Sequence, residues 1–506
     1  MVSTRNILSN WGAFAFAAAV NFVLTPFVIR SLGNTSYGVW VLLVALVGYL
    51  GYLDLGVRGA VTRFVARHHG AADHASASRV ASTALTTFAL AGALAILLSG
   101  VLAVTVGHAA RVPIELRGEA RIVLLLGGLN IAGSLLCGVF GGIVIGMQRF
   151  DYANGVEIGA QALRALLIVA ALKAGYGLVA LATIQLGIAG LRGVTDFLVS
   201  RRLYPELKLR LGEWDRATLK LIFGFGVAAT LLQVLGGMAL YGDSLVIGAF
   251  LPLGLITFFA IASGLTEYAR ALVGGVSQTV SPLASALDGR GQEHRVQEAL
   301  VSGARLAMLV VTPVAITFLL RGPAFIALWM GTDYRELSGA VLRILTVALW
   351  AVSGYQVVTA TVMGIGRHQG LVPAFLAEVV CNVALSVWWV RPYGIVGVAW
   401  GTTVPRLAFS LLFAPWYARR ALAIPMQRLW LSVWVRPTLA MVPFALATYA
   451  VERFWPADNL PLYFSQVALV LPLALVAAWF TCFSAPERRA VAVRLKLFAR
   501  PVGERL

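Results

Sequence analysis

The chain has 506 residues, of which 59% are hydrophobic and only 12% are charged, and its formal net charge is +18. A soluble protein of this length carries about 25% charged residues, so this composition excludes a water-soluble globular protein. Nucleic-acid binding does not explain the positive charge, because no aromatic-basic module accompanies the Lys and Arg residues. The composition favours a membrane protein with many spans, whose basic residues gather in cytoplasmic loops.

Long uncharged stretches recur along the whole chain, and many reach the roughly 20 residues that a membrane-spanning helix requires. They are continuous rather than alternating, so they predict helices and not the strands of a barrel. The first stretch is too long for the apolar core of a signal peptide, and we expect it to remain as a span. We predict an all-α integral membrane protein with about fourteen transmembrane helices, at approximately 7–29, 38–60, 80–106, 120–146, 153–172, 177–199, 218–241, 244–270, 298–320, 337–363, 370–390, 394–416, 431–451 and 462–483.

The Lys and Arg residues predict the orientation of these spans. With the N-terminus in the cytoplasm, 24 of the 40 basic residues fall in inside segments and 9 in outside segments, among them Arg321. The positive-inside rule therefore places both termini in the cytoplasm of a multi-pass protein of the bacterial inner membrane. The connections are short and contain no P-loop, so a transporter of this kind would use an ion gradient, the membrane potential or a substrate gradient.

The two halves of the chain share short sequence landmarks at nearly the same offset. The segment 146–149 (GMQR) recurs 218 residues later as 364–367 (GIGR), and 176–179 (YGLV) recurs 217 residues later as 393–396 (YGIV). Such a repeat predicts two six-helix lobes related by internal pseudo-symmetry, as in transporters built from parallel repeats. We expect an N-terminal lobe at 1–217, a C-terminal lobe at 218–428, and two additional helices with a basic cytoplasmic tail at 429–506.

Several motifs occur in an order typical of one transporter superfamily, namely 24–33 (LTPFVIRSLG), 37–40 (YGVW), 53–56 (LDLG), 327–331 (ALWMG), 364–367 and 393–399 (YGIVGVA). With them, nearly the whole chain resembles the polysaccharide flippases of the multidrug/oligosaccharidyl-lipid/polysaccharide (MOP) exporter superfamily. The resemblance implies alternating access between two lobes. It also implies translocation of an undecaprenyl-pyrophosphate-linked oligosaccharide from the cytoplasmic to the periplasmic leaflet, for lipopolysaccharide or exopolysaccharide biosynthesis.

The partners that the resemblance implies are the lipid-linked oligosaccharide, membrane lipids, and a polysaccharide polymerase with other proteins of the synthesis complex. Another substrate of the same superfamily remains open, either a peptidoglycan lipid precursor or a cationic drug. The outer segments are short and the six histidines form no spaced constellation, so we expect no enzyme, no cofactor and no metal site.

Ionisable residues inside the predicted spans are the candidates for function, because each costs about 2.5–3.5 kcal/mol at mid-bilayer. Three pairs have helical spacing and suggest local salt bridges, namely Asp54 with Arg58, Arg192 with Asp196, and Glu267 with Arg270. Four arginines have no acid three or four residues away, namely Arg164, Arg305, Arg343 and Arg406.

Guanidinium groups bind phosphate bidentately and stay charged, so intramembrane arginines suit a lipid pyrophosphate. The candidates for the pyrophosphate and sugar are Arg58, Arg164, Arg270, Arg305 and Arg343, with Tyr52 and Tyr268 for stacking on sugar rings. The candidates for a coupling proton, a sodium ion or a charge pair are Asp54, Glu157, Glu267 and Glu378. Glu157 and Glu378 occupy equivalent spans of the repeat. Snorkelling or structural pairing is the alternative for each residue.

Overall fold

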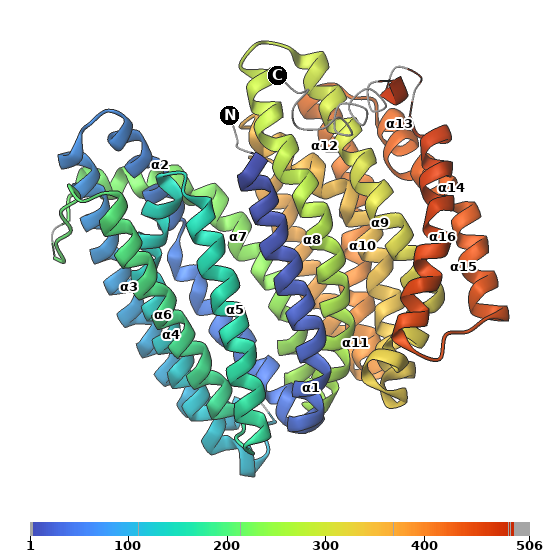
Figure 1. Ribbon diagram of the computed structural model, residues 1–506, viewed down its shortest axis with the longest axis horizontal. Helices are drawn as coiled ribbons and strands as arrows, with labels where there is room; N and C mark the ends of the chain where they lie inside the picture. The colour runs from blue at the N-terminus through green and yellow to red at the C-terminus, as the bar shows by residue number, and fades with distance from the viewer. Residues whose placement is uncertain are drawn as a thin grey trace, which may run out of the picture. The chain divides into compact units, whose positions relative to one another are not determined.

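The computed structural model describes residues 4–109, 111–212, 214–367, 369–483, 485 and 487–489, and most of these residues are helical (Figure 1). The predicted all-α membrane architecture is confirmed. The chain forms two compact units, Met1–Ala260 and Ile261–Leu506. The three-part division at 217 and 428 stays a prediction, and most of the predicted basic tail lies outside the described residues.

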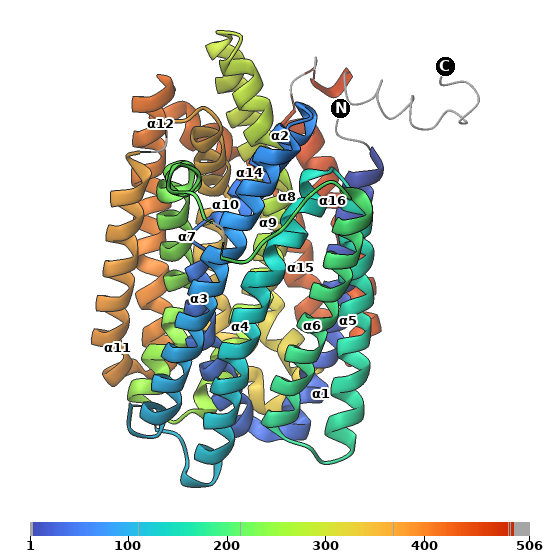
Figure 2. The same cartoon turned by 90° about the vertical axis from the view of Figure 1, so that its left-hand side faces the viewer.

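The first unit is built from long helices that pack along their lengths. Its elements are α1 (Thr4–Leu50), a 3-10 turn η1 (Gly51–Asp54), α2 (Val57–Gly70), α3 (His74–Ala109), η2 (Ile114–Leu116), α4 (Arg117–Gly146), α5 (Phe150–Lys173), α6 (Leu178–Leu203), α7 (Arg216–Phe250) and the first turns of α8 (Gly254–Asp288). Helix α4 packs against α3 and α6, and α5 packs against α1 and α6 (Figure 2). The main apolar core lies where α2, α3 and α4 meet, around Phe64, Phe88 and Val139.

The second unit centres on α9 and α10, which pack closely together. Its elements are the rest of α8, α9 (Glu293–Met330), η3 (Thr332–Tyr334), α10 (Arg335–Gly364), α11 (Leu371–Ala408), the π-helix η4 (Phe409–Phe413), α12 (Ala414–Leu422), α13 (Met426–Leu429), the π-helix η5 (Trp430–Val435), α14 (Arg436–Ala440), α15 (Val442–Phe454) and α16 (Leu460–Thr481). Helices α15 and α16 pack against each other and against α9.

Eleven helical segments within the described residues are long and apolar enough to cross a membrane. Two of them, Phe14–Gly70 and Leu371–Leu422, each contain two predicted spans. Gly33 and Gly394 have non-helical backbone angles and break the helix between the two spans of each pair. The predicted span 218–241 falls in α7, which is not among the eleven. The count of fourteen therefore stays a prediction.

The predicted second span, 38–60, is not one helix. Helix α1 ends at Leu50, and a 3-10 turn follows. Leu55 (φ 48°) and Gly56 (φ 77°) then take left-handed backbone before α2 begins. Leucine rarely takes a positive φ, because this conformation carries a steric penalty for its side chain. Neither the hydropathy of the segment nor the residue type at position 55 therefore indicated the break.

The predicted break between the seventh and eighth spans, at 242–243, is also wrong. Helix α7 runs through Gly242 and Asp243 to Phe250, and the chain turns at Pro252 before α8 begins. Asp243 is only 6% exposed. A Gly-Asp pair is typical of turns, but here it lies inside a helix whose aspartate is buried.

The segment that joins α6 to α7 is held along α3 by a row of hydroxyl groups. The hydroxyls of Ser78, Ser82 and Thr86 accept the backbone N–H groups of Lys208, Arg210 and Gly212, at 3.1, 3.1 and 3.0 Å respectively. Four helical residues rise about 6 Å, which is close to the roughly 6.6 Å covered by two extended residues. The hydroxyl groups along α3 and the backbone N–H groups of the connecting segment therefore have nearly the same spacing.

Asp215 begins α7 at the end of this connection. Its carboxylate accepts the backbone N–H of Thr218 at 2.8 Å and the hydroxyl of Thr218 at 2.6 Å. These hydrogen bonds lower the pKa of Asp215. The carboxylate thus caps the helix and satisfies an N–H group that has no partner within it.

The first copy of the repeated Gly-X-X-Arg segment forms a helix cap at the end of α4. The backbone N–H of Gln148 donates to the carbonyl of Ile145 (2.9 Å). The N–H of Arg149 donates to the carbonyl of Val144 (3.2 Å). Gln148 has a φ of 59°, in the left-handed region. This is the hydrogen-bond pattern of a Schellman cap.

The second copy forms the same cap at the end of α10. The N–H of Gly366 donates to the carbonyl of Met363 (3.1 Å), and the N–H of Arg367 donates to the carbonyl of Val362 (3.0 Å). Gly366 has a φ of 74°. The sequence repeat therefore corresponds to a repeated backbone geometry.

We predict that two substitutions at these caps act in opposite directions. Gln148→Gly should raise stability by about 1 kcal/mol, because glycine takes left-handed backbone without the penalty of a side chain. Gly366→Gln should lower stability by about 1–2 kcal/mol for the same reason. Thermal unfolding of the two variants in detergent tests this prediction, and shifts in the same direction would contradict it.

Candidate functional site

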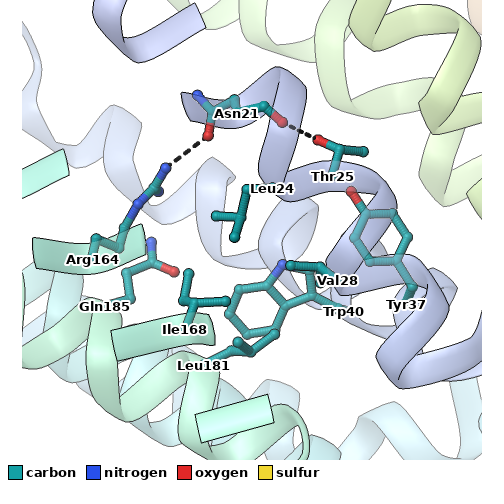
Figure 3. Close-up of a pocket in the computed structure, with 10 residues that line it drawn as sticks. All are labelled: Asn21, Leu24, Thr25, Val28, Tyr37, Trp40, Arg164, Ile168, Leu181 and Gln185. Atoms are coloured by element: carbon teal, nitrogen blue, oxygen red, sulfur yellow. Dashed lines mark hydrogen bonds between the residues drawn. The ribbon is translucent and has the colours of Figure 1, made fainter. Parts of the chain in front are cut away.

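The first unit contains a small cavity between α1, α5 and α6 (Figure 3). Its volume is about 140 Å³, and its lining residues are Asn21, Leu24, Thr25, Val28, Tyr37, Trp40, Arg164, Ile168, Leu181 and Gln185. One wall is apolar and aromatic, whereas the other carries two amides and a guanidinium group. Of the arginines predicted for substrate binding, Arg164 is the one that lines this cavity.

Arg164 projects from the middle of α5 toward α1, where its Nη2 donates to Asn21 Oδ1 at 3.0 Å (Figure 3). Asn21 is held in turn by its own helix, because its backbone carbonyl accepts the hydroxyl of Thr25 at 2.7 Å. An arginine at the centre of a predicted span is costly unless it meets polar groups or water. The amide of Asn21 supplies such a group and orients the guanidinium.

A second cavity of about 190 Å³ adjoins the first and shares Trp40 and Gln185 with it. Asn130 of α4 and Tyr241 of α7 also line it. Asn130 is 9% exposed, and its Oδ1 accepts no hydrogen bond from the described residues. A buried carbonyl oxygen without a donor costs free energy, so the cavity offers an acceptor to a bound hydroxyl or to water.

The predicted tyrosine, Tyr52, belongs to an aromatic group beside the second cavity. Its ring lies 6.4 Å from that of Tyr49, which lies 5.8 Å from that of Tyr241. Tyr52 also packs against Gly237 of α7, where a Cβ atom would overlap the ring. Tyr268, the other predicted tyrosine, is partly buried on α8 in the second unit, and it is not part of this aromatic group.

Asp54 and Arg58 meet as predicted, but across a helix break rather than along one helix. Asp54 Oδ1 accepts the backbone N–H of Arg58 at 3.1 Å, and Oδ2 lies 3.5 Å from its Nε. The carboxylate thus caps the start of α2 as well as pairing with the guanidinium. Arg58 also reaches α4, where its Nη2 donates to the carbonyl of Ser134 at 3.4 Å.

The predicted pairing of Arg192 with Asp196 is wrong. Arg192 Nη1 lies 2.7 Å from Glu157 Oε2 of the neighbouring helix α5, and the Nε2 of Gln161 donates to the other oxygen of Glu157 at 2.9 Å. Asp196 stays within electrostatic range of Arg192, Arg58 and Glu157. Glu157 is therefore a charge-pair residue between α5 and α6.

Glu378 forms a comparable pair in the second unit. It is 6% exposed, and its Oε1 lies 3.8 Å from the Nε of Arg406, across the break at Gly394. Arg406 had no predicted partner because the pair is 28 residues apart in the sequence. Each of these two carboxylates, which lie in spans that the repeat predicts to be equivalent, is thus paired with an arginine of the following span.

Three other predicted arginines are held by contacts within the second unit. Arg270 pairs with Glu267 as predicted, with its Nη2 2.5 Å from the carboxylate. Arg305 pairs with Glu487, which lies 182 residues further along the chain and so was not indicated by local spacing. Arg343 donates from Nε to the carbonyl of Leu319 at 3.0 Å.

Arg321 is the residue that sequence analysis misses most clearly, because the sequence predicts it in an outside segment. It lies inside α9 and is 1% exposed. Its Nε donates to Glu452 Oε2 of α15 at 2.8 Å, and its Nη2 donates to Gln466 Oε1 of α16 at 2.5 Å. Its guanidinium also lies 4.4 Å from the ring centre of Tyr463.

The cavity amides Asn21, Asn130 and Gln185 were missed as well. All three lie inside predicted spans, where a neutral amide is also costly. A search that included amides as well as ionisable groups would have found them. The helices and the polar cavities together are those of a multi-span membrane protein.

Comparison with known proteins agrees with this class. The chain belongs to the polysaccharide biosynthesis protein family, whose sequence profile matches residues 28–339. It is 21% identical over 417 residues to the "Putative O-antigen transporter" of Shigella flexneri, covering 81% of this chain and 97% of that protein. It is 24% identical to the "Uncharacterized membrane protein EpsK" of Bacillus subtilis, covering 99% of both chains.

Solved structures share the fold. The lipid II flippase MurJ in an inward closed conformation has a TM-score of 0.75 at 13% identity, covering 94% of this chain and 98% of that one. An inward-facing multidrug resistance MATE transporter of the MOP superfamily has a TM-score of 0.71 at 18% identity, covering 82% and 95%. The family match confirms the predicted resemblance to polysaccharide biosynthesis proteins, and the chain shares the fold of a MOP-superfamily transporter. The matched proteins with a named role are transporters or flippases rather than enzymes.

Proposed function

We propose that this protein is a flippase that moves an undecaprenyl-pyrophosphate-linked oligosaccharide from the cytoplasmic to the periplasmic leaflet of the bacterial inner membrane. The mechanism is alternating access driven by an ion gradient or the membrane potential. The observation that carries the proposal is the cavity in which Arg164 faces aromatic and amide side chains, in a chain of the polysaccharide biosynthesis family. The naming of the Shigella flexneri relative as an O-antigen transporter supports it.

The chemistry of the cavity suits a sugar phosphate. A guanidinium keeps its charge at any working pH and donates two parallel hydrogen bonds to phosphate oxygens. Trp40 and Tyr37 offer apolar faces to the C–H side of a sugar ring, and Gln185 can donate to and accept from hydroxyl groups. The small volume admits one such group at a time, so we infer that the cavity receives part of the headgroup.

Arginines near the middle of other helices support a hydrated pathway. Arg192 of α6 is 45% exposed and Arg270 of α8 is 42% exposed, although each pairs with a carboxylate. A guanidinium exposed to hydrocarbon is strongly disfavoured, whereas one exposed to water in a cavity is not. We therefore infer that both side chains face water inside the protein.

The test is deletion of the gene in its host, with and without complementation by the wild-type chain. Spheroplasts are treated with a membrane-impermeant oxidant of vicinal diols, and the lipid-linked glycans are then analysed by mass spectrometry. The deletion should leave an undecaprenyl-pyrophosphate oligosaccharide unoxidised in the inner leaflet, and complementation should restore its oxidation. Full oxidation in the deletion strain would refute the proposal, and accumulation of a peptidoglycan precursor instead would identify a different substrate.

A further inference from the structure

The second unit contains a groove where the turn between α10 and α11 faces η4 and α12. Its volume is about 760 Å³, and six of its lining residues are Arg367, Phe409, Phe413, Trp416, Tyr417 and Arg420. None of the residues that we place in the transport site line it. We call it the Arg420 groove.

Tyr417 fixes the shape of this groove. Its hydroxyl donates to the carbonyl of Arg367 at 2.7 Å and accepts the backbone N–H of Gly370 at 3.2 Å. The Tyr417 ring also stacks on that of Phe413, with 5.5 Å between centroids. Helix α12 is thereby tied to the N-terminus of α11, whose partial positive charge favours an anion nearby.

The two arginines of the groove differ in their partners. Arg367 pairs with Glu293 at 3.3 Å and with Asp288 at 3.9 Å. Arg420 is exposed and lies 5.8 Å from the ring centre of Trp416, and no described residue forms an ion pair with it. The positive charge of Arg420 is therefore the one that a bound anion would meet.

The groove lies where two long apolar helices end, which is where a membrane meets water. Tryptophan, tyrosine and arginine are the residues typical of this level of a bilayer. Leu412 and Leu376, which lie close in sequence to lining residues on η4 and α11, are 59% and 49% exposed. Such large exposed leucines suit contact with acyl chains. A basic groove beside them suits the headgroup of the same lipid.

We propose that the Arg420 groove binds the phosphate headgroup of an anionic bilayer phospholipid. Arg420 contacts the phosphate, Trp416 and Phe413 flank the glycerol region, and the acyl chains lie along the exposed leucines. A resident phospholipid is favoured over the transported glycolipid because the groove presents no amide side chain other than Gln369 for reading sugar hydroxyls. This inference does not rest on the proposed transport function.

The test uses native mass spectrometry of the full-length protein in detergent, titrated with phosphatidylglycerol or with phosphatidylcholine of the same acyl chains. Wild type should retain phosphatidylglycerol preferentially. Arg420→Gln should weaken that binding about tenfold or more, because it removes a charge-assisted contact. Arg419→Gln is the matched control, because it makes the same charge change on the next residue, which does not line the groove.

Four outcomes would overturn the proposal. Equal weakening by both variants would mean that only overall charge matters. Equal retention of the two lipids by wild type would mean that the headgroup is not recognised. Displacement of phosphatidylglycerol by inorganic phosphate alone, or retention of a polyprenyl glycan that phosphatidylglycerol cannot displace, would assign the groove to another ligand. None of these outcomes changes the result expected in the transport assay. The lipid-binding proposal and the proposed transport function can therefore be refuted independently of each other.

Discussion

Replacing Arg321 by methionine should lower the free energy of unfolding by about 3–5 kcal/mol, which is the usual loss when one partner of a buried ion pair is removed. Arg321 is the most buried charged residue among those described, at 1% exposure. Its loss leaves Glu452 and the Oε1 of Gln466 without their donors. The packing of α15 and α16 on α9 should weaken together with these contacts.

Two further variants make this prediction specific. Combining Arg321→Met with Glu452→Leu should recover at least half of the lost stability, because an apolar pair of similar volume replaces the charges. Arg335→Met, at an exposed position at the start of α10, should change stability by less than about 0.5 kcal/mol. Unfolding of the detergent-solubilised protein measures all three, and equal stability of Arg321→Met and Arg335→Met would refute the assignment.

Arg164→Ala should lower the rate of glycolipid translocation by about 10- to 100-fold, which corresponds to the loss of one charge-assisted contact worth about 1.5–3 kcal/mol. Arg164→Lys should keep part of the rate, because an ammonium retains the charge but not the planar pair of donors. The cavity is small and its remaining lining residues offer no second cation to replace the guanidinium.

The measurement is the fraction of lipid-linked glycan that becomes accessible at the periplasmic face, in the complemented deletion strain and at matched protein levels. Lys173→Ala is the control, because it removes an exposed positive charge from the end of the same helix, outside the cavity. Wild-type accessibility in a well-expressed Arg164→Ala strain would remove Arg164 from the pathway. Equal defects in both variants would show that the charge of α5, and not the cavity, is what matters.

Hydropathy and local spacing predicted the helical membrane fold and the contacts between residues close in sequence. The pair of Glu267 with Arg270 formed as its spacing indicated. Arg192 did not follow its spacing, because Glu157 on the adjacent helix offers a closer carboxylate than Asp196. Which carboxylate pairs with an arginine depends on how the helices pack, and local spacing in a single sequence does not show that packing.

Helix breaks and long-range partners were the other sources of error. The break before Arg58 depends on a left-handed leucine, Leu55, which no turn preference would predict. Arg321 follows an apolar run, so it was placed in a loop. Its partners Glu452 and Gln466 lie 131 and 145 residues further along the chain. Of the polar residues that line the cavity around Arg164, only Arg164 itself was predicted, because amide side chains inside the spans were not considered.

The separation of Arg321 from Glu452 and Gln466 along the chain also imposes an order on biogenesis. A ribosome delivers α9 to the insertion machinery long before it has made α15 and α16, so Arg321 enters the membrane before its counter-charge exists. Until then water or lipid headgroups must solvate the guanidinium, which holds that end of α9 near the bilayer surface. Arrival of the last two helices supplies the carboxylate of Glu452 and the amide of Gln466, so the buried contacts of Arg321 can be completed only near the end of translation.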